Sequence, residues 1–164
     1  MSHSRPSAVG DTGTVVARAR LSSTVQISDA IEFVRNKRNG MLITTKADGR
    51  PQSSNIAFRV DDDDRILVSV TDGRAKTTNL RRIPRASLHV NRDDFWAYAV
   101  IEADVELTPV AVAPGDSTVD RLVDYYRAVA GEHDDWDEYR QAMVDEGRLL
   151  LVLSPTHAYG MLGR

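Results

Sequence analysis

The most informative segment of the chain reads Asp72-Gly73-Arg74-Ala75-Lys76-Thr77-Thr78-Asn79-Leu80-Arg81-Arg82-Ile83-Pro84-Arg85. From Arg74 onward it holds five basic residues and no acid, although the whole chain has a formal net charge of −3. An apolar, β-branched run precedes the Asp-Gly turn, and Pro84 follows most of the basic residues. This order predicts a strand over 65–71, a turn, and a short helix over 76–82.

The start of that helix has the features of an anion-binding site. Unpaired backbone N–H groups and the helix dipole favour negative charge at a helix N-terminus. Arg74 offers a fork of donors to a phosphate, and Lys76 adds a point charge. Neutral hydrogen bonds are available from the three residues that follow: Thr77, Thr78 and Asn79. We therefore predict phosphate binding here; the alternative is a solvated basic face, to which we assign Arg81, Arg82 and Arg85.

A predicted hairpin lies upstream of this segment. The apolar run 41–45, an Asp-Gly turn at 47–50 and the run 51–60 indicate two antiparallel strands. Just after the turn, three side chains offer donors and acceptors to a ring with imide and carbonyl edges: Gln52, Ser54 and Asn55. Alternatively, these polar residues serve the turn itself.

The remaining pattern indicates a mainly β, α+β fold. Further strands are predicted over 86–91, 96–108, 148–154 and 156–160, with a solvated tip of four acids at 61–64. Helices are predicted from Ser28 to Gly40, from Ser117 to Gly131, and from Trp136 to Gly147. Strands, a helical pair and strands again predict an antiparallel barrel with helical insertions. Residues 1–21 are expected to form a flexible arm before a cofactor-binding domain over 22–164.

Composition excludes several classes of function. The chain has no cysteine, which excludes disulfides, thiolate zinc sites and iron–sulfur clusters. It also lacks an apolar run of membrane-spanning length and a signal-peptide pattern, so we expect a cytoplasmic protein. A sequence pI near 5.8 argues against nucleic acid as a partner. His89, His133 and His157 show no metal-ligand spacing, and nucleotide-binding glycine motifs and a Gly-x-Ser-x-Gly nucleophile motif are missing.

Trp96 and Tyr98 are two residues apart on one predicted strand, which places them on the same face. There they can cover an isoalloxazine-like ring. Core packing and a dimer contact are the alternatives for both residues.

Taken together, these segments resemble the pyridoxamine-phosphate-oxidase-like split-barrel family, and most closely its actinobacterial deazaflavin-dependent branch. The resemblance rests on residues 48–55, 72–80 and 84–86, and extends through 96–100, 131–133 and 136–143. It covers about residues 27–160. It implies a six-stranded split β-barrel with flanking helices, and a homodimer with two cofactor sites at its interface. The implied cofactor is the 8-hydroxy-5-deazaflavin coenzyme F420, with FMN as the alternative.

The resemblance also implies roles for individual residues. Phosphate contacts fall on Arg74, Lys76 and Asn79. Ring and ribityl contacts fall on Gln52, Ser54, Asn55, Ser69 and Val70. Trp96 and Tyr98 come from the neighbouring subunit, and His89 lines the substrate side.

The activity implied by the resemblance is reduction of an electron-poor small molecule, such as an enone, a quinone or a tetrapyrrole, by hydride from the reduced deazaflavin. The sequence shows no dedicated proton donor, so water, Tyr98 and His89 remain candidates. Two alternatives stay open: an FMN-dependent oxidase of the pyridoxamine-phosphate type, and a non-catalytic carrier of the coenzyme.

Overall fold

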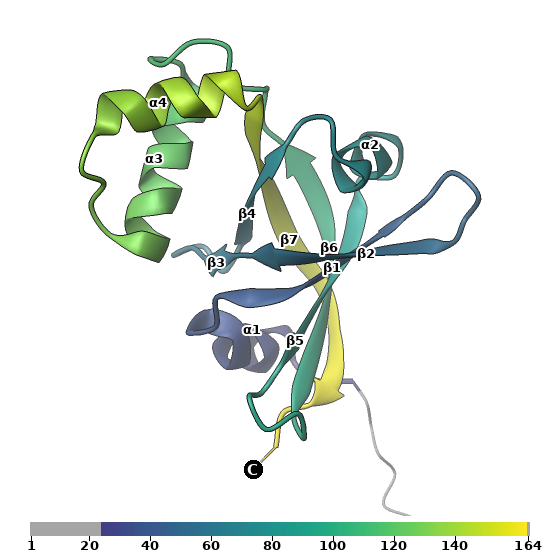
Figure 1. Ribbon diagram of the computed structural model, residues 1–164. Coiled ribbons are helices and arrows are strands. Elements are labelled where there is room, and N and C mark those ends of the chain that lie inside the picture. Colours follow the sequence, from purple (N-terminus) through teal and green to yellow (C-terminus); the bar gives the residue numbers. More distant parts are fainter. Residues whose placement is uncertain (1–23, 164) are drawn as a thin grey trace, which may run out of the picture.

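A computed structural model describes residues 24–163, which form a curled seven-stranded antiparallel sheet flanked by four helices (Figure 1). The strands are β1 (Asn39–Thr45), β2 (Pro51–Ala57), β3 (Arg59–Val60), β4 (Ile66–Thr71), β5 (Arg85–Asn91), β6 (Tyr98–Leu107) and β7 (Arg148–Met161). The helices are α1 (Ile27–Arg35), α2 (Ala75–Arg82), α3 (Ser117–Ala130) and α4 (Trp136–Asp145). The expected arm, residues 1–21, lies outside the described residues.

The sheet has the strand order β2-β1-β5-β6-β7-β4-β3. It curls so far that β2, at one edge, contacts β4 near the other edge, although the two are not hydrogen-bonded neighbours in the described sheet. This boundary between β2 and β4, where no hydrogen-bonded strand pair closes the sheet, is the split of the barrel. The predicted α+β split barrel is confirmed. Its strand count is seven rather than six, and one of the seven, β3, is only two residues long.

Alternating side chains of the strands form the core of the barrel. In β4 the inward residues are Ile66, Val68 and Val70, each at most 2% exposed. Helix α1 closes one end of the barrel with Ala30, Ile31 and Val34. Full burial of one large apolar side chain contributes roughly 1.5–3 kcal/mol, so this core is the main support of the sheet.

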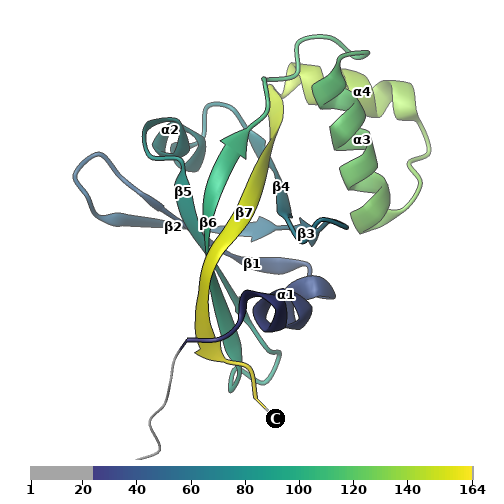
Figure 2. The same cartoon turned by 180° about the vertical axis from the view of Figure 1, so that it is seen from behind.

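Helices α3 and α4 form a second apolar cluster on one side of β4, and α2 lies on the other side (Figures 1 and 2). Helix α3 begins at Ser117, as predicted, but Ser117 is not the capping residue. Asp116 is the N-cap, because its carboxylate accepts from the backbone N–H of Val119 at 2.8 Å. Gly131 ends α3 at a φ of 86°, as predicted.

Gly40 does not end the first helix; it lies within β1, and α1 ends at the cap residue Asn36. A Cβ at position 40 would lie 3.0 Å from the carbonyl oxygen of His89, so glycine lets β1 approach β5 closely. The two predicted C-terminal strands are one strand, β7. A register shift opposite Glu102 and Ala103 accommodates the segment that separated them in the prediction.

The four acids at 61–64 are not uniformly solvated. Asp61 is only 8% exposed. Its carboxylate accepts from the backbone N–H groups of Asp63 and Arg65 and from the Arg65 guanidinium. The first acid of the run therefore organises the β3–β4 turn, while the following three are exposed.

Within residues 24–163, no helix combines the length and apolar character needed to cross a membrane. The same part of the chain contains no group of three or more His, Cys, Asp or Glu side chains arranged to hold a metal ion.

Candidate functional site

A cleft of about 520 Å³ opens where the barrel is split, between α2 and the α3–α4 pair. Its floor is formed by residues 55–57 at the end of β2 and 69–71 at the end of β4. Three basic side chains line it: Arg74, Lys76 and Arg148. The helical pair contributes an aromatic and apolar wall: Tyr125, Tyr126, Tyr139 and Met143. We call this space the cation cleft.

The turn between β4 and α2 places the first two cations at the cleft. Arg74 has extended backbone angles at the N-cap of α2, and its carbonyl accepts from the N–H of Thr78 at 3.1 Å. Thr77 Oγ1 donates to the carbonyl of Thr71 at 3.0 Å and ties the first turn of the helix to the end of β4. The first turn of α2 contains no acidic residue, so the positive end of its dipole is not neutralised from within the helix.

The cleft is electrostatically one-sided. Among the described residues that line it, three are basic and none is acidic. The pKa of Lys76 is lowered from its ordinary value, first by burial and then by the charges of Arg74 and Arg148. The two arginines therefore make the charged form of Lys76 less favourable, and a bound anion would relieve this repulsion.

Two tyrosines of the opposite wall are held by backbone carbonyls. Tyr125 Oη donates to the carbonyl of Ala57 at 3.2 Å, which ties α3 to the end of β2. Tyr139 Oη donates to the carbonyl of Leu122 at 3.2 Å, and burial raises the pKa of Tyr139 to about 12. Burial also raises the pKa of Tyr125. Both phenols therefore stay protonated at neutral pH and act as part of the wall.

Apart from Thr77, which is buried and donates to the carbonyl of Thr71, the predicted site residues fall into three groups. The first lies in the cation cleft and combines predicted phosphate and ring contacts: Asn55, Ser69, Val70, Arg74 and Lys76. Sequence reasoning missed the remaining lining residues, which include Arg148 and the aromatic side chains of the helical pair. The strand pairing and helix packing that bring them to the cleft leave no local signal in the sequence.

The second group forms an internal hydrogen-bond network beneath α2. Asn79 Nδ2 donates to Thr44 Oγ1 at 3.1 Å, and Thr44 Oγ1 donates to Gln52 Oε1 at 3.1 Å. Gln52 Nε2 donates to Ser54 Oγ at 2.8 Å. This network ties α2 to the β1–β2 hairpin. The sequence predicted a phosphate role for Asn79 and ring roles for Gln52 and Ser54. In the structure these side chains face this network and do not line the cation cleft.

The third group lies at the β5–β6 hairpin. The prediction that Trp96 and Tyr98 share a strand face is wrong, because β6 begins only at Tyr98. Trp96 lies in the preceding turn, where Phe95 has a positive φ of 69°. Both turn aromatics are exposed, Trp96 by 80% and Phe95 by 76%. Tyr98 is half-buried, with its ring centroid 5.4 Å from that of His89.

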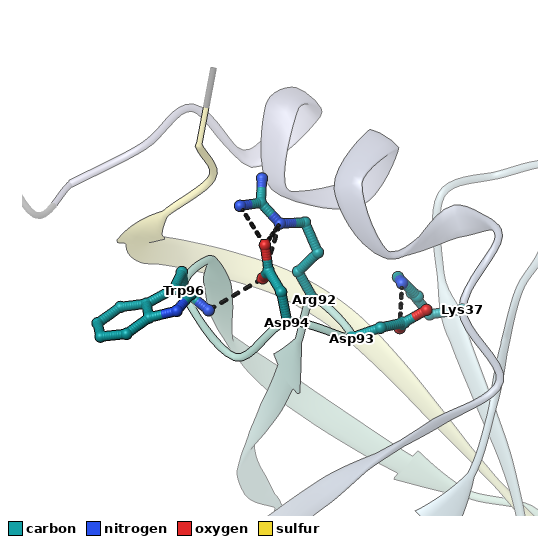
Figure 3. Close-up of polar contacts among 5 residues, drawn as sticks. All are labelled: Lys37, Arg92, Asp93, Asp94 and Trp96. Carbon is teal, nitrogen blue, oxygen red and sulfur yellow. Dashed lines mark hydrogen bonds and ion pairs between the residues drawn. The ribbon is translucent and has the colours of Figure 1, made fainter.

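Ion pairs shape this turn (Figure 3). The Arg92 guanidinium donates to the Asp94 carboxylate, which also accepts from the backbone N–H of Trp96 at 3.0 Å. Lys37 pairs with Asp93 at 2.8 Å. The indole ring of Trp96 points away from these groups and is free to contact another surface.

A second groove, of about 890 Å³, adjoins the cation cleft. Residues 55–57 line both spaces, so the end of β2 is the ridge between them. On its far side the groove is lined by residues of β5 and the β5–β6 turn, including His89, Asn91 and Phe95. His89 Nε2 lies 3.2 Å from Asn91 Oδ1. A molecule in this groove would thus lie beside one in the cation cleft.

Proteins of known structure share this fold. A conserved hypothetical protein from Mycobacterium tuberculosis is 20% identical, with a TM-score of 0.66 over 85% of this chain and 87% of that chain. An F420 reductase is 22% identical, with a TM-score of 0.57 over 77% of this chain and 93% of that chain. A haem storage protein from Vibrio cholerae is 16% identical, with a TM-score of 0.60 over 79% of this chain and 90% of that chain. At these identities the likeness concerns the fold alone.

The sequence itself carries a more specific relationship. Residues 27–162, which include every strand and helix described above, match the sequence pattern of the pyridoxamine 5'-phosphate oxidase family. The split-barrel fold agrees with this match. The chain therefore belongs to the pyridoxamine 5'-phosphate oxidase family.

Proposed function

We propose that the chain binds a phosphorylated flavin-type coenzyme, F420, in the cation cleft and uses it to reduce an electron-poor small molecule. The observation that carries the proposal is the cleft itself, in which Arg74 and Lys76 meet Arg148 with no acid among the described lining residues. Family membership supports a flavin-type cofactor. The resemblance of residues 72–80 to the deazaflavin-dependent branch, together with an F420 reductase among the proteins that share the fold, is the reason for proposing the deazaflavin ahead of FMN.

The residues of the cleft fit such a coenzyme by their chemistry. The cations suit a phosphate, which accepts several charge-assisted hydrogen bonds. Asn55 and Ser69 offer neutral donors and acceptors for a ribityl chain and polar ring edges, and Val70 adds an apolar contact. Once bound, the reduced deazaflavin supplies a hydride, while the protein supplies position and electrostatics.

The adjoining groove is the proposed acceptor site. It shares residues 55–57 with the cation cleft, so an acceptor there lies next to the coenzyme. Holding two reactants in near-attack geometry can lower a barrier by about 7–11 kcal/mol. His89 lines this groove, and the ring of Tyr98 packs against that of His89. Both residues, together with water, are therefore candidate proton donors.

We also propose a homodimer in which Trp96 and Tyr98 of one subunit approach the coenzyme of the other. The exposure of Trp96 on a turn braced by the Arg92–Asp94 pair supports this arrangement. Sedimentation velocity of the wild type tests the dimer, and fluorescence titration of the wild type and Trp96→Ala with F420 tests the contribution of Trp96. We expect a dimer for the wild type and weaker coenzyme binding for the variant; a wild-type monomer with full coenzyme affinity contradicts the arrangement.

The deciding experiment is a parallel fluorescence titration of the purified protein with F420 and with FMN, accompanied by absorbance titration with hemin. Tight binding of F420 alone, followed by reduction of a quinone or enone panel, supports the proposal. Preferential binding of FMN with oxygen consumption and peroxide release supports the oxidase instead. Tight F420 binding without turnover on any acceptor supports the carrier. Haem binding without a flavin response contradicts all three.

A further inference from the structure

We infer that Arg148 is a third phosphate-binding residue of the cation cleft, acting with Arg74 and Lys76. The inference rests on the proposed function in so far as the phosphate belongs to a coenzyme. The ligand chemistry is a phosphate ester whose oxygens accept from two arginines and one lysine. In the sequence, Arg148 is 74 residues beyond Arg74 and outside the basic segment.

The sheet brings the two ends of this site together. Strands β4 and β7 are antiparallel, and Arg148 is the cross-strand partner of Thr71. Thr71 in turn accepts through its carbonyl from Thr77 Oγ1 in the first turn of α2. Arg148, the first residue of β7, therefore lies beside Thr71, whose carbonyl holds the first turn of α2.

The backbone around Arg148 is held on both sides. The N–H of Asp72 donates to the carbonyl of Gly147 at 2.9 Å, and the N–H of Ala111 donates to the carbonyl of Arg148 at 2.8 Å. Gly147 has a φ of 59°, a conformation that favours glycine and turns the chain from α4 into β7. The Cα of Arg148 is thus fixed relative to α2, and only its side chain is free to adjust.

The guanidinium of Arg148 has donors to spare. Its Nε donates to Glu146 Oε2 at 2.7 Å. The two terminal nitrogens of Arg148 carry two N–H groups each. Within residues 24–163, neither of them donates a hydrogen bond to the protein. The side chain is 31% exposed and lines the cleft. Glu146 therefore holds the inner nitrogen and leaves the outer edge of the fork for a ligand.

The surroundings of Arg148 agree with this orientation. Arg148 lines the same cleft as Lys76, Tyr125 and Tyr139. Its positive charge also lowers the pKa of Lys76, after burial and the charge of Arg74. A structural role for the Arg148–Glu146 pair is a weak alternative, because half-exposed ion pairs contribute only about 0–1 kcal/mol. Replacing Arg148 is therefore expected to leave the fold intact.

The test compares Arg148→Ala and Arg148→Lys with the wild type, and uses Arg81→Ala as the control. Arg81 lies on α2, pairs with Asp72 and does not line the cleft. Each protein is titrated with F420, FMN and riboflavin, which lacks the phosphate, and binding of inorganic phosphate is followed by ³¹P NMR. Circular dichroism verifies folding.

We expect Arg148→Ala to weaken binding of F420, FMN and inorganic phosphate about 10- to 100-fold, as for loss of a charge-assisted hydrogen bond. Riboflavin binding should stay unchanged, Arg148→Lys should fall in between, and Arg81→Ala should match the wild type. Unchanged affinity in Arg148→Ala, with a loss in Arg74→Ala, overturns the inference and leaves the proposed function standing.

If no flavin binds the wild type, the proposed function fails, and the phosphate measurement alone decides the role of Arg148. Phosphate binding that is lost in Arg148→Ala then supports a phosphate site for another ester. Phosphate binding that is retained in Arg148→Ala, or missing in the wild type, overturns the inference.

Discussion

The two ends of helix α2 carry similar charge and meet different surroundings. At the N-terminal end, Arg74 and Lys76 line a cleft in which the described residues include no acid. At the C-terminal end, Arg81 pairs with Asp72, while Arg82 donates to the carbonyl of Thr45 and to Asn79 Oδ1. The cations of the N-terminal end line the cleft, whereas the guanidinium groups of the C-terminal end donate to acceptors of the protein itself.

This difference shows that cations of one basic segment meet different surroundings according to their position on the helix: the first two line a cleft, and the later ones contact the protein itself. Both ends belong to one basic segment. The helix start separates Arg74 and Lys76 from the later arginines, but it does not identify Asp72 as the carboxylate with which Arg81 pairs. The helix dipole adds to the contrast, because it favours anions at the N-terminal end and cations at the C-terminal end. Four measurements test the comparison, from the largest expected effect to the smallest.

The largest effect is expected from the double variant Arg74→Ala/Lys76→Ala. Loss of two charged hydrogen bonds at about 1.5–3 kcal/mol each should weaken F420 or FMN binding at least ~100-fold. Fluorescence titration measures this, with riboflavin as the ligand that should not change. The control Arg81→Ala/Arg85→Ala removes the same charge outside the cleft. If the two double variants lose affinity equally, the binding is non-specific attraction and the comparison of the two ends fails.

The second prediction concerns the middle of the helix. Asn79 is 7% exposed and bonded at both ends of its amide, so Asn79→Ala should lower the free energy of unfolding by about 1–3 kcal/mol. Coenzyme affinity of the folded variant should change little. Urea unfolding and titration measure the two effects, with the exposed Thr78→Ala as control. A large loss of affinity with unchanged stability would instead make Asn79 a phosphate ligand.

The third prediction uses the lowered pKa of Lys76. As pH rises through that pKa, the lysine loses its charge, so phosphate-ester binding should weaken below the ordinary lysine pKa of about 10.4. Lys76→Arg should remove this decline, because the guanidinium stays charged. Titrations between neutral pH and about pH 10 test both statements. Parallel pH profiles in the two proteins would exclude Lys76 as the titrating group.

The same shift fixes the sign for stability. At low pH Lys76 is charged in the folded and the unfolded chain, so the full repulsion is present in the fold. Between the lowered pKa and the ordinary value, the folded state loses its proton first. The contribution of Lys76 to stability without ligand therefore improves as pH rises through this window. Comparison of the wild type with Lys76→Arg in urea unfolding isolates it.

The smallest effect is expected at the other end of the helix. Arg81→Ala removes a half-exposed ion pair with Asp72, which should change stability by about 0–1 kcal/mol. Thermal unfolding should shift by a few degrees at most. A loss of several kcal/mol would show that the C-terminal cations hold the turn before α2, and hence that both ends of the helix support the site.

Much of the fold was accessible from local patterns. The Asp-Gly turns, the alternating strands and the basic helix start are encoded within a few residues each, and the structure confirms them. Boundaries that depend on neighbours were missed. Gly40 resembles a helix end but serves a close approach to β5, and Asp61 resembles a solvated acid but caps a turn. Trp96 was placed on a strand because the turn that contains it, with Phe95 at positive φ, has no glycine to mark it.

The sequence by itself determined the fold class, the family resemblance and the first two cations of the cleft, because short-range periodicity, turn chemistry and helix-end electrostatics act within a few residues. Only the tertiary structure decided which polar side chains face the cleft. Curling of the sheet brings β2 to β4, and the β4–β7 ladder brings Arg148 to Thr71. The pairing beneath α2 turns Gln52, Ser54 and Asn79 toward one another. These contacts join residues far apart in the chain, and strand register, which is set by burial across the whole sheet, determines them.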